Sequence, residues 1–190
     1  MTQRRPFIVG IGGTTVTPSS TERALEIALR AAAGQGADVE MFGGAFLSRL
    51  PLYAQRMERT REERALVDAV RRADGVVIAS PGYHGSVSGL IKNALDLLEE
   101  TAGDPRVYLT GVPVGVIATA YGWQATGGTI AALRGIVHAL RGWPTPLAAA
   151  VNSAASRFAD DGVCSDPAVT AQLGLVGQQV VEFLRRPALA

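Results

Sequence analysis

Short apolar runs alternate along the chain with longer segments whose apolar residues recur every three or four positions. The run over 7–11 is continuous and stops at two glycines, as is typical of a strand buried on both faces of a parallel sheet. Similar runs predict further strands over 38–42, 75–80, 112–119 and 146–151. The pattern therefore predicts five strands.

Segments at helical spacing separate these runs and predict five helices. Their expected ranges are 20–33, 62–73, 88–100, 130–140 and 167–185. Ser19 and Glu22 fit a capping box, in which the side chain of each bonds the backbone amide of the other. The segment 43–61 contains Pro51 and shows no sustained period, so we expect a loop there.

Alternation of strands and helices predicts the α/β class, because neighbouring parallel strands are joined by crossover helices. We expect a doubly wound, five-stranded parallel sheet in the flavodoxin-like order 2-1-3-4-5, with helices on both faces. The 190 residues contain no internal repeat and no low-complexity linker, which predicts a single domain over 1–190. In such sheets ligands bind beyond the carboxyl ends of the strands, where the strand order reverses.

The charge and the numbers of cysteine and histidine residues exclude several kinds of binding partner. The net charge is +1 and no run of lysine or arginine exceeds two residues, so we expect no nucleic acid partner. Cys164 is the only cysteine and there are two histidines, a set that offers no disulfide, no CxxC pair and no structural zinc site. The apolar runs are too short for a signal peptide or a membrane span, and we expect a cytoplasmic protein.

The loop after the first predicted strand carries hydroxyls at six of the eight positions 14–21 and leads into a helix. Free backbone amides and the helix dipole make such a terminus an anion site. The candidate phosphate ligands are Thr14, Ser19, Ser20 and Thr21. A polar turn that caps a helix would have the same composition. Neither a P-loop nor a dinucleotide fingerprint is present, which favours a mononucleotide phosphate.

Two further loops at predicted strand ends combine glycines with aromatic residues. The first contains Pro81, Gly82, Tyr83, His84, Gly85 and Ser86, and the second contains Thr119, Tyr121 and Gly122. Glycines let the backbone approach a flat ligand, and aromatic rings offer planar surfaces to it. Alternatively the aromatic residues belong to the core or an interface. Because both loops flank the candidate phosphate site, we favour a ligand.

These residues resemble the NAD(P)H-dependent FMN reductase family of flavodoxin-like proteins. The segment 80–98 is similar to the family pattern Pro-x-Tyr-Asn-x-x-x-x-Gly-x-Leu-Lys-Asn-x-x-Asp-Trp/Leu-Leu. The matching positions are Pro81, Tyr83, His84, Gly89, Ile91, Lys92, Asn93, Asp96 and Leu98. The resemblance covers nearly the whole chain.

The resemblance implies that the three loops bind FMN. The first loop would hold the phosphate, the loop around Tyr83 would line the isoalloxazine ring, and the loop around Tyr121 would cover another ring edge. The sequence departs from the family at two positions. Val16 stands where a phosphate-contacting arginine is usual, and His84 replaces an asparagine.

The activity implied by the resemblance is hydride transfer from NADPH or NADH to FMN. The acceptor would be oxygen, a quinone, an azo compound, a metal oxyanion or a partner monooxygenase that takes reduced FMN. No side chain is expected to act as acid, base or nucleophile, because the flavin carries the chemistry. The resemblance also implies a homodimer or homotetramer.

Two other functions remain open from the sequence. One is a flavodoxin-type electron carrier, against which the near-neutral charge argues, since such carriers tend to be acidic. The other is a scaffold that has lost flavin binding.

Overall fold

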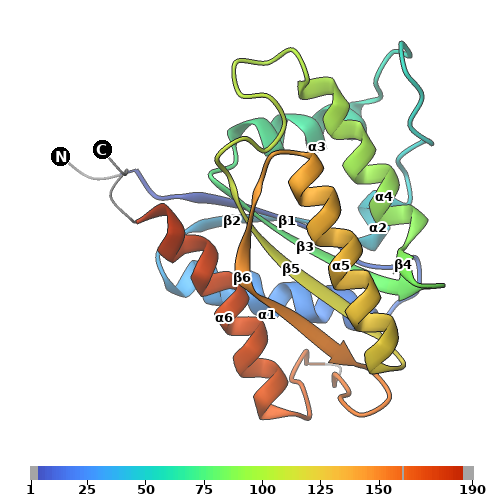
Figure 1. Ribbon diagram of the computed structural model, residues 1–190, viewed down its shortest axis with the longest axis vertical. Coiled ribbons are helices and arrows are strands. Elements are labelled where there is room, and N and C mark those ends of the chain that lie inside the picture. The colour runs from blue at the N-terminus through green and yellow to red at the C-terminus, as the bar shows by residue number, and fades with distance from the viewer. Residues whose placement is uncertain (1–3, 160, 186–190) are drawn as a thin grey trace.

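The computed structural model describes residues 4–159 and 161–185 (Figure 1). Its parallel strands are β1 (Phe7–Gly12), β2 (Asp38–Phe42), β3 (Gly75–Tyr83), β5 (Pro113–Ala120) and β6 (Trp143–Asn152). They lie in the order β2-β1-β3-β5-β6. Counted among the parallel strands alone, this is the order 2-1-3-4-5, so the predicted topology is confirmed. The short strand β4 (Ser86–Val87), which was not predicted, pairs antiparallel with the end of β3.

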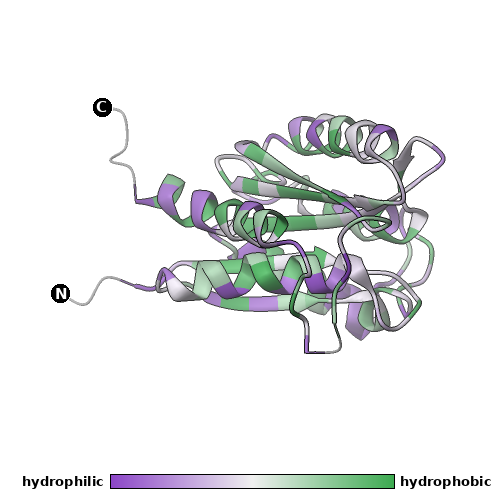
Figure 2. Ribbon diagram, turned by 90° about the horizontal axis from the view of Figure 1, so that it is seen from below, coloured by the Kyte–Doolittle hydropathy of each residue, from purple (hydrophilic) through white to green (hydrophobic). Residues whose placement is uncertain are grey.

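Helices cover both faces of the sheet (Figures 1 and 2). One face packs against α1 (Ser20–Gly34) and α6 (Pro167–Leu184). The other packs against α3 (Arg61–Arg72), α4 (Gly89–Asp96) and α5 (Trp123–Ala139). A 3-10 helix, η1 (Leu97–Thr101), follows α4, and the short α2 (Gly44–Leu47) follows β2.

The strands are buried on both faces because consecutive side chains enter different cores. Ile8 packs with α1 and α6, whereas its neighbour Val9 packs with the helices of the opposite face. In β3, Val77 likewise packs with α1 and α6, and Val76 packs with the helices of the opposite face. A continuous apolar run is therefore what a central strand of this sheet requires.

Local structure differs from the sequence expectation in the region 19–44. The Ser19 hydroxyl caps α1 by accepting from the Glu22 amide at 3.2 Å, as predicted. The Glu22 carboxylate, however, lies by the amide of Gly44 instead of returning to Ser19. The reason is tertiary: Gly44 begins α2, within the segment expected to be a loop, and packs against Thr14 so closely that a Cβ would lie 1.8 Å from the Thr14 carbonyl oxygen.

A complete capping box occurs instead at α3. The Thr60 hydroxyl accepts from the Glu63 amide, and the Glu63 carboxylate accepts from the Thr60 amide at 2.7 Å. Arg59 adds an ion pair to Glu63 at 3.2 Å and another to Glu100 at 3.0 Å. These bonds hold the end of the 48–60 segment against α3.

The described residues lack both a membrane-spanning helix and a cluster of metal ligands. No helix within them combines the length and the apolar character needed to cross a bilayer. Over the same residues, no three His, Cys, Asp or Glu side chains gather as a metal site would require.

Candidate functional site

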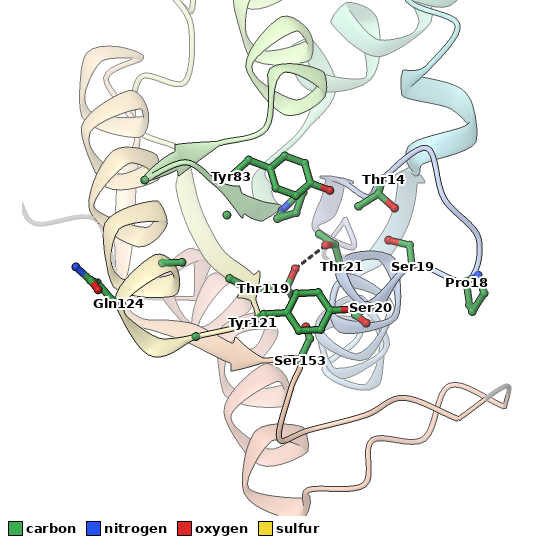
Figure 3. A pocket seen from close by; sticks show the side chains of 16 residues that line it. Thr14, Pro18, Ser19, Ser20, Thr21, Tyr83, Thr119, Tyr121, Gln124 and Ser153 are labelled. Atoms are coloured by element: carbon green, nitrogen blue, oxygen red, sulfur yellow. Dashed lines mark hydrogen bonds between the residues drawn. The ribbon is translucent and has the colours of Figure 1, made fainter.

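A cavity of about 640 Å³ opens at the carboxyl ends of β1, β3 and β5 (Figure 3). These three strands are neighbours in the sheet, so the loops that follow them meet at one edge. The volume lies in the range of small-molecule and cofactor sites, about 300–1,000 Å³. The cavity is therefore large enough for a nucleotide.

The first loop contributes all four residues expected from the sequence. Thr14, Ser19, Ser20 and Thr21 line the cavity. The loop is fixed by close packing: Gly13 has a φ of 140°, and a Cβ there would lie 2.5 Å from the Gly44 amide nitrogen. Val16 is 67% exposed and is not among the lining residues.

Glu22 stands in the first turn of α1, beside this loop. Burial raises the pKa of its carboxyl above the ordinary value, and the Gly44 amide opposes that effect only in part. Glu26, one turn further along, raises the pKa as well.

Thr21 and Thr119 join the first loop to the end of β5. Their hydroxyl oxygens lie 2.6 Å apart, and both residues are buried. This hydrogen bond uses one of the two hydroxyl hydrogens. The second has no other acceptor among residues 4–159 and 161–185, so it can be donated to a ligand in the cavity that both residues line.

The loop after β3 is a tight hairpin between Tyr83 and Ser86, which pair across it. Its central residues His84 and Gly85 have φ values of 50° and 86°, the left-handed conformation that a two-residue hairpin loop needs. Asparagine and histidine are among the residues that tolerate it best. The turn thus accounts for His84 at a position where the family pattern has asparagine.

The hairpin gives four of its six candidate residues to the cavity. Pro81, Gly82, Tyr83 and Gly85 line it, whereas His84 and Ser86 do not. Ser80 holds the base of the hairpin, because its hydroxyl donates to the Pro81 carbonyl at 2.9 Å and accepts from the Ser88 amide at 3.1 Å.

The loop after β5 brings Thr119, Tyr121 and Gly122 to the cavity, as expected. Tyr121 is 86% exposed and Tyr83 is 54% exposed, and Figure 3 shows their rings on either side of the Thr21–Thr119 pair. A Cβ added at Gly85 or Gly122 would meet no atom within 4 Å. Bare backbone beside open space, together with two exposed rings, suits a flat ligand.

Sequence reasoning missed five lining residues. They are Pro18, Ala120, Gln124, Ala125 and Ser153. Pro18 and Ala120 adjoin residues that were named, and Gln124 and Ala125 lie within three positions of Gly122, so a wider loop definition would have included these four. Ser153 follows β6, and the rule that ligands bind at strand ends could have found it, although its loop lacks glycines and aromatic residues close by.

Comparison with known proteins identifies the family. The sequence model of the NADPH-dependent FMN reductase family matches residues 6–156. The chain belongs to this family. The match confirms the resemblance seen in the sequence and covers the three loops of the cavity.

Relatives of the chain carry names of the same kind. An FMN-dependent NADPH-azoreductase of Staphylococcus saprophyticus is 37% identical over 99 residues, which are 52% of this chain and 49% of that protein. An FMN reductase (NADPH) of Escherichia coli is 29% identical over 137 residues, 70% of this chain and 63% of that protein. The matched regions thus span about half to two thirds of these relatives.

Solved structures show the same fold. FerB, a flavoenzyme NAD(P)H:(acceptor) oxidoreductase from Paracoccus denitrificans, aligns with a TM-score of 0.76 at 22% identity, over 96% of this chain and 98% of FerB. The NADH:FMN oxidoreductase EmoB aligns with a TM-score of 0.71 at 23% identity, over 97% of this chain and 91% of that one. This chain therefore shares its fold with these two flavoenzymes.

Proposed function

We propose that this member of the FMN reductase family transfers hydride from NADPH or NADH to FMN bound in the cavity. The observation that carries the proposal is the convergence of three loops, distant in sequence, on one cavity at the switch point of the sheet. Family membership supports the same activity.

The residues at one end of the cavity suit the FMN phosphate. Ser19 and Ser20 stand at the N-terminus of α1, where the helix dipole favours an anion. The Thr21–Thr119 pair has a hydroxyl hydrogen to donate. These groups would hold a phosphate through neutral donors, because no lining residue bears a formal charge.

Lining residues on either side of the Thr21–Thr119 pair suit the isoalloxazine ring. Tyr83 and Tyr121 offer aromatic faces, and Gly85 and Gly122 leave space beside the backbone. His84 and Ser86, which the family resemblance assigns to the ring, would act through the hairpin turn that positions Tyr83.

Bound FMN would supply the hydride-accepting chemistry. The chain then needs to orient two ligands and to keep water from the reacting faces. The lining residues include no carboxylate, imidazole, amine or thiol.

Neutral phosphate donors also favour an exchangeable flavin. A charge-assisted bond is about twice as strong as a neutral one, so the valine at position 16 weakens the grip that an arginine would give. We propose that reduced FMN can leave the protein and pass its electrons to oxygen, a quinone or a partner monooxygenase. The homodimer or homotetramer implied by the resemblance is part of the proposal, and light scattering after size exclusion tests it.

The first test is oxidation of NADPH and NADH, followed by absorbance at 340 nm, with and without added FMN. Consumption that requires both protein and FMN supports the reductase. A flavodoxin-type carrier would bind FMN and consume neither coenzyme. Failure to bind FMN at micromolar concentration would contradict both functions.

A further inference from the structure

A second hollow, of about 470 Å³, adjoins the main cavity at the end of β6. It is lined by Ser20, Tyr121, Ser153, Ala154, Arg157 and Phe158. The first three of these also line the main cavity, so the two hollows are neighbours that share these side chains. Figure 3 shows Ser20 and Ser153 beside that ring.

Arg157 is the one charged residue that lines either hollow. Within residues 4–159 and 161–185, no carboxylate forms an ion pair with its guanidinium. Arg23 on the neighbouring helix differs, because it pairs with Glu26 at 3.1 Å. Among the residues that the structure describes, the positive charge of Arg157 in the second hollow therefore has no carboxylate partner.

The backbone that carries Arg157 is held in place. Its amide donates to the Ser165 hydroxyl at 3.0 Å, and the Ser165 amide donates to the Arg157 carbonyl at 2.8 Å. Phe158 and Cys164 form an antiparallel bridge next to them. The Ser153 amide donates to the Ala120 carbonyl at 2.8 Å, which ties the start of this segment to the end of β5.

We propose that Arg157, with the hydroxyl of Ser153, binds a phosphate group of the reduced nicotinamide dinucleotide. The inference rests on the proposed function: with the nicotinamide on the flavin, the rest of the dinucleotide must extend out of the main cavity. A cation beside its phosphates strengthens their binding, and arginine binds phosphate through paired, charge-assisted hydrogen bonds. The second hollow provides the adjoining space and that cation.

The experiment measures binding of the oxidised coenzymes by calorimetry, in the presence of FMN. Arg157→Gln should weaken NADP⁺ binding about ten-fold or more, as expected for loss of a hydrogen bond to a charged group. A loss confined to NADP⁺ assigns Arg157 to the 2′-phosphate, and an equal loss for NAD⁺ assigns it to the pyrophosphate. Unchanged binding of both coenzymes overturns the proposal.

Two controls keep the result interpretable. Arg61→Gln removes an exposed arginine at the start of α3, on the other face of the sheet, and should leave coenzyme binding unchanged. The affinity for FMN is measured on the same variants. If Arg157→Gln weakens the binding of FMN but not of the coenzymes, Arg157 is a flavin ligand and the proposal is overturned.

The inference and the proposed function fail in different ways. If wild-type protein binds FMN and oxidises NADPH while Arg157→Gln binds coenzyme normally, only the inference is wrong. If wild-type protein neither binds FMN nor oxidises either coenzyme, the proposed function is wrong.

Discussion

The hydroxyl oxygens of Thr21 and Thr119 lie 2.6 Å apart, although 98 positions separate the two residues in the sequence. One residue stands in the first turn of α1 and the other at the end of β5. The hydrogen bond joins the end of the cavity that suits a phosphate to the loop that suits a ring. Both residues are buried, so each hydroxyl depends on the other in the absence of a ligand.

Replacing either threonine by valine should therefore destabilise the fold. Thr21→Val leaves the Thr119 hydroxyl without this partner, which should lower the free energy of unfolding by about 1–3 kcal/mol. The variant with both threonines replaced by valine should lose less free energy of unfolding than the two single variants lose in sum, because it removes both polar groups together. Urea unfolding measures all three variants, and strictly additive losses would argue against coupling.

Ser19 should matter for both stability and flavin binding. Ser19→Ala removes the cap of α1 and should cost about 1 kcal/mol of unfolding free energy. If Ser19 also holds the phosphate, the variant should lose more affinity for FMN than for riboflavin, which lacks that group. Fluorescence titration with each flavin gives the two affinities.

Thr60→Ala is the matched control for Ser19. It removes the equivalent cap from α3, on the opposite face of the sheet, and should lower stability by a similar amount. Its ratio of FMN to riboflavin affinity should equal that of the wild type. If Ser19→Ala lost affinity for FMN and for riboflavin to the same extent, Ser19 would not be a ligand of the phosphate.

His84 should act through the conformation of its backbone. At a φ of 50°, a β-branched residue is strongly disfavoured, so His84→Val should lower the free energy of unfolding by about 1–2 kcal/mol. His84→Asn should retain stability, because asparagine tolerates the left-handed region. Thermal unfolding compares the two, and equal stability of the valine and asparagine variants would contradict this role.

Replacing Tyr83 should change the absorbance spectrum of bound FMN. If its ring packs at the isoalloxazine, Tyr83→Ala should shift the absorbance bands of bound FMN and weaken its binding. Tyr83→Phe keeps the ring and should preserve the spectrum. An unaltered spectrum in the alanine variant, measured at saturating FMN, would count against the contact.

Glu63 should contribute to the loss of stability in acid. Burial alone would raise the pKa of its carboxyl, but hydrogen bonds from Thr60 and Arg59 outweigh that effect, so the pKa lies below its ordinary value of 4.5. A pKa depressed by folding contributes stability above the unfolded-state pKa, and that stability is lost as the pH falls through the folded-state pKa.

Glu63→Gln should therefore be less stable than the wild type at neutral pH and should lose less stability below about pH 4.5. Urea unfolding at a series of pH values measures both. Glu58→Gln, at an exposed position on the preceding segment, is the control and should follow the wild-type profile. If the free energy of unfolding changes with pH in the same way in Glu63→Gln and in the wild type, Glu63 does not contribute to the loss of stability in acid.

Much of the fold could be predicted because it depends on local patterns. Continuous apolar runs identified the three central strands β1, β3 and β5, since each is buried against two helical layers. The carboxyl ends of adjacent strands meet at one edge, which brought eleven of the thirteen candidate residues to a single cavity. Short elements escaped prediction: β4 has two residues and α2 has four, too few to show a period.

The sequence by itself determined the class of fold, the strand order and the three loops that surround the cavity. Tertiary structure alone decided the bond between Thr21 and Thr119, the approach of Glu22 to Gly44 and the placing of Arg157 in the second hollow. The physical reason is the range of the interactions. Periodicity and capping involve residues within a few positions, whereas these contacts form only after the sheet has brought separate strand ends together.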